Sequence, residues 1–241
     1  MLWIDHSFAA PAQNLALEEV LLEQVVAGAR PSLLRFWESP TPFVVLGTAQ
    51  CLSTEVIETA CIADGVPIMR RCSAGGCVLQ GPGSLNFTLV LAIDAYPEVR
   101  GIRDSYCHIA DCLRRAFATR NLALRHGGTS DITFNGKKVS GNAQRRRRNA
   151  VLHHGTLVYQ PNFGGMARYL GEPADRPAYR GARTHAEFVG ALPLDAEALK
   201  ALARAAFGAE GAPASLFPEE IRQSEVLARD KYDTAAWIRR R

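Results

Sequence analysis

Between two apolar runs the chain contains the stretch Gly136-Lys137-Lys138-Val139-Ser140-Gly141-Asn142-Ala143-Gln144. Asn135 precedes it, and an Asn-Gly pair between alternating apolar residues is typical of a tight hairpin turn, because both turn positions need a positive φ. The pattern predicts a β-hairpin over residues 131–140. Neighbouring side chains on an extended segment point to opposite faces, so one of the two lysines should face solvent and the other should face inward.

An inward lysine among small residues could hold a phosphate or carboxyl oxygen, because a ligand can approach the backbone closely there. The alternative is a hairpin whose two lysines are both solvated, which is the usual state of lysine. A second glycine-rich segment favours the ligand site. Its sequence is Arg70-Arg71-Cys72-Ser73-Ala74-Gly75-Gly76-Cys77-Val78-Leu79-Gln80. Small residues expose backbone N–H groups and arginines neutralise an anion, although the segment matches neither the Walker pattern nor the dinucleotide fingerprint.

The composition is that of a globular enzyme domain. The 241 residues are 47% hydrophobic and 22% charged, which are ordinary values. No apolar run approaches the ~20 residues that a membrane helix needs, and no signal peptide is evident. The six cysteines form no CxxC pair, which favours reduced thiols in a cytoplasmic protein. The net charge is only +4, and the sequence shows no broad basic face with the aromatic platforms that nucleic-acid binding requires. Neither a nucleic acid nor a membrane is therefore expected as a partner.

The periodicity predicts one mixed α/β domain over residues 1–241. Helices are expected at 14–27, 104–120, from an N-cap at Asp195 through about 207, at 218–229 and at 233–240. Strands are expected near 33–37, 43–47, 66–70, 85–92 and 151–159, besides the hairpin, and Leu85, Phe87, Leu89 and Leu91 should share one face of their strand. The Pro- and Gly-rich segment 161–193 is expected to be irregular, forming a mobile flap.

The two glycine-rich segments resemble those of the lipoate–protein ligase and octanoyltransferase family, whose catalytic domain is related to that of biotin protein ligase. That family has an Arg-Arg-x-x-Gly-Gly-Gly loop, a Gly-Lys-Val-Ser/Ala-Gly-x-Ala segment and a His-Gly-Thr strand. Further matches are His154-Gly155-Thr156, Asn14-Leu15-Ala16-Leu17-Glu18-Glu19 in the family's first helix, Val44-Val45-Leu46-Gly47 with Gln50 in its early strand, and Lys231-Tyr232 with Trp237, which resemble the tail of the octanoyltransferase branch. The resemblance implies an α/β (α+β) fold, with a mixed sheet flanked by helices.

The resemblance also implies the residues of the site. Lys138 matches the family's invariant lysine and is expected to be the catalytic residue, stabilising charge that develops at the acyl carbonyl and the α-phosphate. Asp131 matches an acidic position that contacts the adenylate or its Mg²⁺, the alternative being a turn residue before the hairpin. The other expected substrate-binding residues are Arg71, Ser73, Ala74, Gly75, Gly76, Cys77, Val78, Leu79, Gln80, Ser140, Gly141, Ala143, His154, Gly155 and Thr156.

A cysteine nucleophile is missing from both positions that the family's transferases use. One position lies just before the hairpin, where this chain has no cysteine in residues 126–131, and the other follows the His-Gly strand, whereas the last cysteine is Cys112. Cys72 and Cys77 are expected to be small packed thiols. Because ligase chemistry needs no enzyme nucleophile, the resemblance favours activation of lipoate or octanoate with ATP and Mg²⁺, then transfer to a lysine of a lipoyl carrier domain. ATP-independent octanoyl or lipoyl transfer between carriers, or a non-catalytic lipoyl-binding module, are the alternatives.

Three features bear on the partners. The chain ends where the ligases' carboxy-terminal accessory domain would begin, so the resemblance implies a single catalytic domain. Some ligases supply the accessory domain as a separate polypeptide, which leaves a partner subunit as an open alternative. Cys72 and Ala74 replace an arginine and a glycine of the family's loop, which removes one charge-assisted phosphate contact. The run Arg145-Arg146-Arg147-Arg148 is either a solvated hairpin tip or a device that steers an acidic lipoyl carrier domain onto the site.

Overall fold

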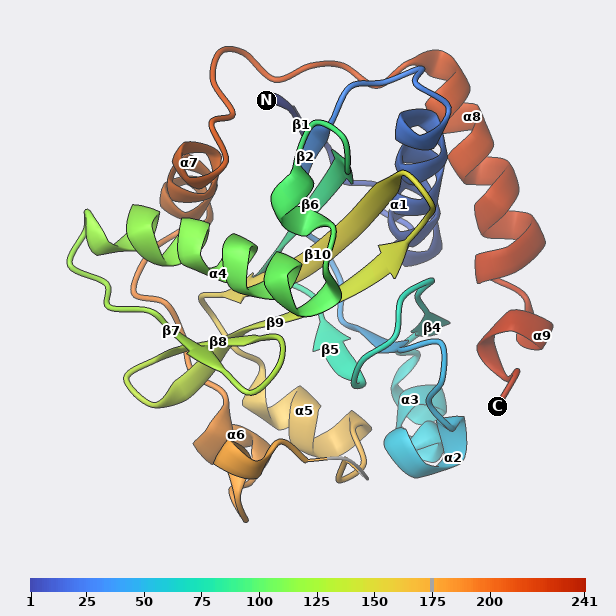
Figure 1. Ribbon diagram of the computed structural model, residues 1–241. Helices are drawn as coiled ribbons and strands as arrows, with labels where there is room; N and C mark the ends of the chain where they lie inside the picture. The colour runs from blue at the N-terminus through green and yellow to red at the C-terminus, as the bar shows by residue number, and fades with distance from the viewer. Residues whose placement is uncertain (174–175) are drawn as a thin grey trace.

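The computed structural model describes residues 1–173 and 176–241. Its strands form a seven-stranded mixed sheet in the order β1-β2-β6-β10-β9-β8-β7 and a three-stranded sheet in the order β4-β3-β5 (Figure 1). The strands are β1 (Leu2–Asp5), β2 (Leu33–Trp37), β3 (Phe43–Leu46), β4 (Ile68–Arg70), β5 (Val78–Gln80), β6 (Ser84–Ala92), β7 (Arg125–Gly127), β8 (Asp131–Phe134), β9 (Lys137–Arg146) and β10 (Ala150–Val158). The predicted mixed sheet is confirmed.

Helices cover both faces of the large sheet. The α-helices are α1 (Pro11–Val26), α2 (Leu52–Glu55), α3 (Glu58–Asp64), α4 (Ile102–Ala118), α5 (Phe163–Tyr169), α6 (His185–Phe188), α7 (Ala196–Ala206), α8 (Pro218–Leu227) and α9 (Ala235–Ile238), and shorter turns are η1 (Pro97–Val99), η2 (Ala178–Arg180) and the π-helix η3 (Ala228–Tyr232). None of the helices among the described residues is long and apolar enough to span a membrane.

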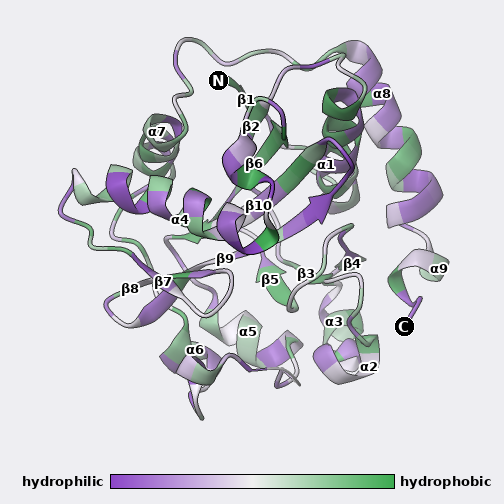
Figure 2. Ribbon diagram, in the orientation of Figure 1, coloured by the Kyte–Doolittle hydropathy of each residue, from purple (hydrophilic) through white to green (hydrophobic). Residues whose placement is uncertain are grey.

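The alternation predicted for β6 divides the core into two layers. Leu85, Phe87, Leu89 and Leu91 pack with residues of α4 and α7 on one face. Val90, which points to the other face, packs with Leu17, Leu21 and Leu22 of α1. Figure 2 shows the hydrophobic residues concentrated on β6 and β10, while the end of β9 is hydrophilic. This arrangement places α1 against the sheet beside the first half of β10, where Ala150 and Leu152 pack with it.

The central hairpin forms as the sequence predicts. Asn135 has φ +50° and Gly136 has φ +75°, which is the conformation that an Asn-Gly hairpin turn requires. β9 then continues to Arg146, beyond the predicted end, and pairs with both β8 and β10. Asp195 also caps α7 as expected, because its side chain accepts a hydrogen bond of 2.8 Å from the backbone N–H of Ala198.

Other expectations need correction. The segment 161–193 contains α5, η2 and α6, so the prediction of irregular structure throughout was wrong; residues 174 and 175 of that segment lie outside the described residues. Asn162 explains α5, because its side chain accepts from the N–H of Gly165 at 2.8 Å. The strands β1, β5 and β7 were not predicted. They are four, three and three residues long, too short to show a clear alternation.

Candidate functional site

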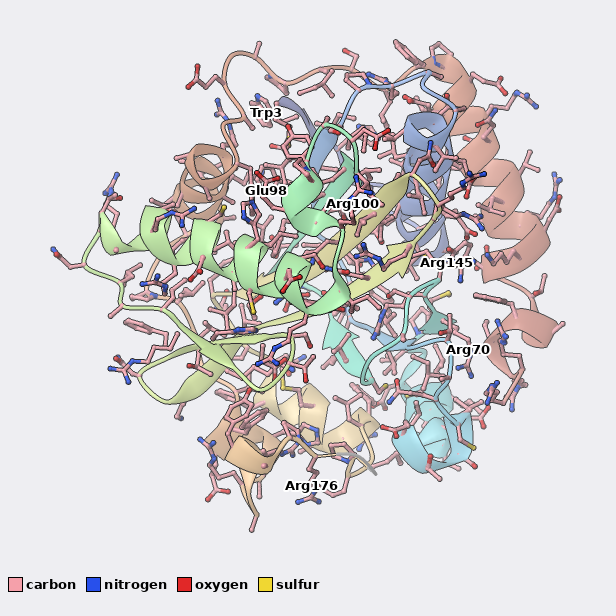
Figure 3. All side chains as sticks on the ribbon, in the orientation of Figure 1. Trp3, Arg70, Glu98, Arg100, Arg145 and Arg176 are labelled. Atoms are coloured by element: carbon pink, nitrogen blue, oxygen red, sulfur yellow. The ribbon has the colours of Figure 1, made fainter. Side chains whose placement is uncertain are left out.

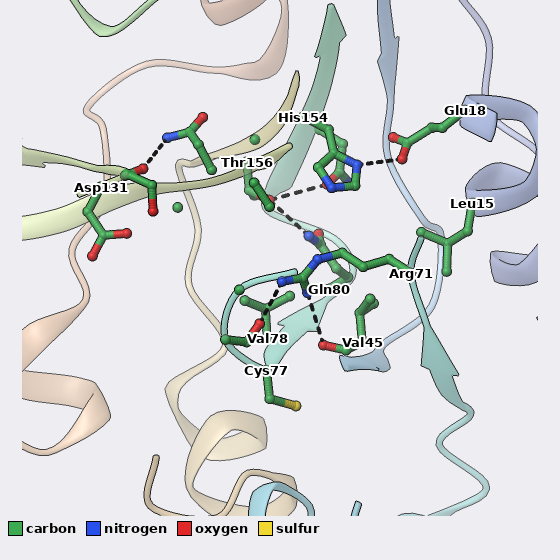
Figure 4. Close-up of a pocket in the computed structure, with 18 of the residues that line it drawn as sticks. Leu15, Glu18, Val45, Arg71, Cys77, Val78, Gln80, Asp131, His154 and Thr156 are labelled. Atoms are coloured by element: carbon green, nitrogen blue, oxygen red, sulfur yellow. Dashed lines mark hydrogen bonds and ion pairs between the residues drawn. The ribbon is translucent and has the colours of Figure 1, made fainter. Parts of the chain in front are cut away.

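Two adjoining cavities lie between the large and the small sheet. The inner lobe has a volume of about 130 Å³ and is lined by residues of α1, β2, β3, β5, β9 and β10. The outer lobe has a volume of about 410 Å³ and is bounded by α5, α6 and the chain between them. Among the residues that line both lobes are Gly76, Cys77, Gln80, Lys138 and Thr156. The lobes therefore meet beside Lys138. Figure 4 shows side chains from strands far apart in sequence converging on the inner lobe.

Lys138 forms an ion pair at this junction. Its Nζ atom lies 2.8 Å from Oδ1 of Asp131, and the hydroxyl of Tyr179 donates a hydrogen bond of 2.6 Å to Oδ2 of the same carboxylate. A Cβ atom on Gly141 would lie 2.9 Å from Nζ, so this glycine leaves room for the lysine. Lys137 is exposed, which confirms that the two lysines face opposite ways. Asp131 is only 8% exposed and begins β8, so it is not a solvated turn residue.

Arg71 shapes the glycine-rich loop from within. Its Nε donates to Ser73 Oγ at 3.0 Å, and its Nη2 donates to the carbonyl oxygens of Ala74 at 2.7 Å and Gly76 at 3.0 Å. Arg71 also lines the inner lobe, so it stays a candidate for binding an anion, although most of its donors already bind the loop. Across residues 1–173 and 176–241, the N–H groups of Ala74, Gly75 and Gly76 donate to no protein acceptor, so they remain as anion-binding donors.

Arg70 is likewise a structural residue. Its Nη1 donates to the carbonyl oxygens of Gly47 at 2.7 Å and Gln50 at 2.8 Å, while Nη2 donates to that of Ile238 at 2.7 Å. The glycine-rich loop also contacts the residue that follows β3, since a Cβ atom on Gly47 would lie 2.1 Å from the carbonyl oxygen of Gly75. Only glycine can occupy position 47 without moving the loop. The carboxy-terminal segment is thus tied to the back of the ligand loop.

A buried chain of hydrogen bonds crosses the inner lobe. Glu18 Oε2 lies 2.6 Å from His154 Nδ1, and His154 Nε2 lies 2.6 Å from Ser73 Oγ. The indole of Trp37 donates to the other oxygen of Glu18 at 3.0 Å. Burial disfavours the Glu18 charge, but the charge and hydrogen bond of His154, with the charge of Arg35, outweigh it and lower the pKa of Glu18. The carboxylate therefore fixes the histidine ring, by the contact drawn in Figure 4, and the ring in turn contacts Ser73 of the loop.

His153 points to the opposite face of β10, as expected for neighbours on a strand. Burial, with the adjacent charge of His154, lowers the pKa of His153 to about 3, so the ring is neutral. It lies 3.2 Å from Oδ1 of Asn142, whose Nδ2 donates to the carbonyl oxygen of Ser130 at 2.8 Å. A Cβ atom on Gly155 would lie 1.9 Å from Asn142 Oδ1. This glycine therefore makes room for an amide that holds the chain just before Asp131.

The two thiols of the ligand loop are poor nucleophiles. Burial raises the pKa of Cys72 and of Cys77 to about 12 in each case, so both are protonated at neutral pH, and the thiolate is the reactive form. Cys72 is 3% exposed. Cys77 lines both lobes, but its sulfur is a protonated thiol and not the reactive thiolate. These positions agree with the expectation of packed, unreactive cysteines.

Two carboxylates line the inner lobe, those of Glu18 and Asp131, and Asp131 also lines the outer lobe. Among residues 1–173 and 176–241 there is no group of three or more His, Cys, Asp or Glu side chains that could hold an ion. Both oxygens of Asp131 have protein partners, Lys138 and Tyr179. Mg²⁺ is commonly held by one or two carboxylates together with substrate phosphates and water. The residues present therefore fit a metal that arrives with a nucleotide, and do not fit a metal held by the protein alone.

The arginine run 145–148 is not a simple solvated tip. Arg146 Nη2 donates to the carbonyl oxygen of Val99 at 2.6 Å, and Arg147 forms an ion pair with Glu23. Arg145 is two residues beyond Ala143 on β9 and shares its face, which is the face of the inner lobe. Figure 3 shows Arg145 at the end of β9, on the side of the molecule that also bears Arg70. The run therefore divides into two structural arginines and two that could meet a partner.

The structure brings most of the predicted site residues together. The inner lobe is lined by Arg71, Gly75, Gly76, Cys77, Val78, Gln80, Asp131, Lys138, Gly141, Ala143, His154, Gly155 and Thr156. Leu79 and Ser140 line the outer lobe only. Ser73 and Ala74 line neither lobe; Ser73 is 1% exposed and acts through Arg71 and His154.

Several lining residues were not predicted. In the inner lobe they are Leu15, Glu18, Trp37, Val45, Asn86, Ser130 and Asn142, and in the outer lobe they include Met166, Leu170, Arg180, His185 and Phe188. The motif at residues 14–19 was a signal for Leu15 and Glu18. No local signal marked the outer-lobe residues, because the segment 161–193 showed no periodicity to place them.

Comparison with known proteins matches the model of the lipoyl protein ligase A/B catalytic domain to residues 10–193. A probable lipoate-protein ligase A of Mycoplasma pneumoniae is 30% identical over 161 residues, which are 66% of this chain and 46% of that protein. The octanoyltransferase LipM of Moorella thermoacetica is 29% identical over 71% of this chain and 70% of that protein. The chain thus spans about half the length of the Mycoplasma relative.

Two solved structures share the fold. One is a bipartite lipoate protein ligase from Thermoplasma acidophilum, studied with its E2 lipoyl domain, with a TM-score of 0.83, 18% identity, and coverage of 99% of this chain and 95% of that chain. The other is a lipoate-protein ligase A bound with ATP, with a TM-score of 0.82, 18% identity, and coverage of 99% and 97%. At this identity the likeness establishes the mixed sheet and its flanking helices.

Proposed function

The chain belongs to the lipoyl protein ligase A/B catalytic-domain family, and we propose that it activates lipoate or octanoate with ATP and transfers the acyl group to a lysine of a lipoyl carrier domain. In the first step the carboxylate of the acid attacks the α-phosphorus of ATP and pyrophosphate leaves. In the second step the carrier's lysine attacks the acyl carbonyl and AMP leaves. The named ligase relative and the ATP-bound structural neighbour support this choice. We place the reaction in the cytoplasm because all six cysteines are free thiols.

The observation that supports the proposal best is Lys138 at the junction of the two lobes. Leu15, Trp37 and Val45 give the inner lobe an apolar wall against which an acyl chain can pack. The outer lobe, larger and lined by apolar side chains such as Met166, suits a nucleotide base. An acid and a nucleotide bound in this way would place their reacting groups beside the ammonium group of Lys138, which would stabilise the charge that develops there.

The remaining polar groups of the site have definable roles. Mg²⁺, if it accompanies the nucleotide, would neutralise phosphate charge and would be held on the protein side by Asp131. The N–H groups of Gly75 and Gly76, which line the inner lobe and donate to no acceptor in the described part of the chain, would bind phosphate or carboxyl oxygens. Glu18 and His154 would hold the loop that presents those groups, since His154 reaches the loop through Ser73.

Exchange of pyrophosphate into ATP in the presence of lipoate or octanoate tests the function. Exchange is expected, because adenylation is reversible and releases pyrophosphate. Acyl transfer from one carrier protein to another without nucleotide would instead identify a transferase, and lipoyl binding without turnover a binding module. The assay is run with and without the protein encoded beside this one, since stimulation by that protein would identify an accessory subunit.

The state of the cysteines provides a separate prediction. Mass spectrometry after incubation with an acyl donor should find no acyl group on Cys72 or Cys77, because burial keeps both thiols protonated. A thioester on either residue would contradict the ligase mechanism and favour direct transfer. Inhibition by a bulky alkylating agent would not do so, since Cys77 lines the cavity.

The carrier is proposed to be acidic and to approach the end of β9. Replacing Arg145 and Arg148 together with glutamine should weaken carrier-dependent transfer through a slower association rate. Within residues 1–173 and 176–241 the side chains of these two arginines have no hydrogen-bond or ion-pair partner, whereas those of Arg146 and Arg147 do. The loss should shrink as salt rises, since charges are screened over about 8 Å near physiological ionic strength. Adenylate formation should hardly change.

Transfer is measured against carrier concentration at two salt levels. Arg222→Gln is the matched control, because Arg222 is an exposed arginine on α8 and lines neither lobe. Equal transfer by the double variant and the parent at low salt would show that Arg145 and Arg148 do not guide the carrier.

A further inference from the structure

Tyr179 connects the chain over the outer lobe to the charged pair at the junction. It belongs to η2, between α5 and α6, and lies 48 residues along the chain from Asp131. Its hydroxyl donates to Oδ2 of Asp131 at 2.6 Å, while Oδ1 of the same carboxylate lies 2.8 Å from Lys138 Nζ. The tyrosine, the aspartate and the lysine therefore form one continuous chain of contacts.

The ring of Tyr179 is closely packed between two glycines and a phenylalanine. A Cβ atom on Gly127 would lie 3.1 Å from its Cζ atom and 3.3 Å from its hydroxyl oxygen, and one on Gly128 would lie 3.3 Å from its Cε1 atom. On another side the ring packs on Phe188, with a distance of 5.2 Å between the ring centroids. The hydroxyl is thus positioned by packing, and the hydrogen bond to Asp131 does not have to hold the ring by itself.

The backbone around Tyr179 is also anchored to the hairpin that bears Lys138. Arg183 donates to the carbonyl oxygen of Tyr179 at 2.6 Å and to that of Gly136 at 3.0 Å. The N–H of Gly190 donates to the carbonyl oxygen of Lys138 itself at 2.8 Å. The segment that contains Tyr179 and Gly190 therefore contacts Lys138 twice. Gly190 binds the backbone of the lysine, and Tyr179 reaches the side chain of the lysine by way of Asp131.

We propose that Tyr179 is a positioning residue for Lys138, acting through Asp131. The inference rests on the proposed function, in that the ammonium group of Lys138 is expected to meet the reacting acyl and phosphate groups. Asp131 is buried and has two partners, so loss of the tyrosine hydroxyl would leave Oδ2 without its donor and allow the carboxylate to rotate. Lys138 would then sample positions away from the junction, and small displacements of a catalytic group are costly in rate.

Competitive amine labelling tests the idea without relying on turnover. Lys137 and Lys138 are labelled with trace acetic anhydride and distinguished by tandem mass spectrometry, with the exposed Lys137 as internal reference. In Tyr179→Phe the ratio of Lys138 to Lys137 labelling should rise by about threefold or more, because Lys138 is held less firmly. Tyr169→Phe is the matched control, since Tyr169 donates a hydrogen bond of 2.8 Å to Asp64 and lines neither lobe.

Kinetics test the consequence for the reaction. Tyr179→Phe should lower kcat for pyrophosphate exchange by about tenfold while KM for acid and ATP stays within about twofold, because the ring and the lobes are retained. In an Asp131→Asn background the same substitution should change kcat little, since the tyrosine is proposed to act through that carboxylate. Tyr169→Phe should match the parent in both assays.

The outcomes separate the two proposals. An unchanged labelling ratio in Tyr179→Phe would refute the positioning role, whether or not the parent enzyme gives exchange. Independent, multiplying losses from Tyr179→Phe and Asp131→Asn would also refute it. Absence of exchange in the parent would count against the proposed ligase function alone, and the labelling ratio would still decide the role of Tyr179.

Discussion

Replacing Lys138 with alanine should lower the rate of acyl-adenylate formation by about 10²-fold or more, the loss expected from removing one preorganised electrostatic contact. Lys138 is one of the side chains that line both lobes, and no other lysine of residues 1–173 and 176–241 lines either of them. The substitution also leaves Asp131 buried without its cation. Pyrophosphate exchange at saturating acid and ATP measures the effect on kcat, and binding of octanoate by calorimetry measures the effect on the ground state.

Lys137→Ala is the matched control for this prediction. Lys137 is the neighbouring residue on the same strand and is exposed, so its removal should change the exchange rate little. Equal losses at the two positions would show that the charge at the junction is not specific to Lys138. A normal rate in Lys138→Ala would exclude the lysine from the chemistry.

Replacing Glu220 with alanine should destabilise the protein by about 3–5 kcal/mol, because it leaves a buried arginine unpaired. Arg30 and Glu220 are joined by two hydrogen bonds, of 2.8 Å from Nε and 2.7 Å from Nη2, and their side chains are 4% and 1% exposed. Glu220 also accepts from the N–H of Phe217 at 2.7 Å. The pair connects the chain after α1 to the first turn of α8. Denaturant unfolding followed by circular dichroism measures the change.

Glu219→Ala provides the comparison at the next position along the chain. Glu219 pairs with Arg222 on the exposed face of the same helix, and exposed pairs contribute little because water and salt screen them. Its loss should hardly change the unfolding midpoint. The double variant Arg30→Met with Glu220→Leu should be more stable than Glu220→Ala, since no charge is left buried. A double variant as unstable as Glu220→Ala would show that altered packing, and not the unpaired charge of Arg30, lowers the stability.

Elements with a clear local pattern were predictable from the sequence. The Asn135-Gly136 turn needs two positive φ angles, and few other residues tolerate them. The alternation in β6 reflects the period of a strand, and the buried face of α4, with Ile109, Leu113 and Phe117, reflects the period of a helix. By contrast, β5 and the helices α5 and α6 have three to seven residues each. Such short elements depend on tertiary contacts, so their own residues show no reliable period.

The candidate site divides in a similar way. Lys138, Asp131 and the glycine-rich loop were found from motifs, because a ligand loop needs small residues in sequence and a hairpin lysine has a recognisable setting. The loop contacts of Arg70 and Arg71 could not be predicted, since a sequence shows two cations but not the backbone carbonyl oxygens that they bind. Tyr179 could not be found in this way, because no spacing connects it to Asp131.

By itself, the sequence determined the fold class, the order of the main elements and the presence of a lysine that faces inward from a hairpin. These properties follow from side-chain period and turn conformation, which act over a few residues. The tertiary structure decided which charges are available to a ligand. Glu18 meets His154, which is 136 residues away, and Asp131 receives Lys138 on one oxygen and Tyr179 on the other. Hydrogen bonds and ion pairs depend on distances in space, and only the packing of helices and strands sets those distances.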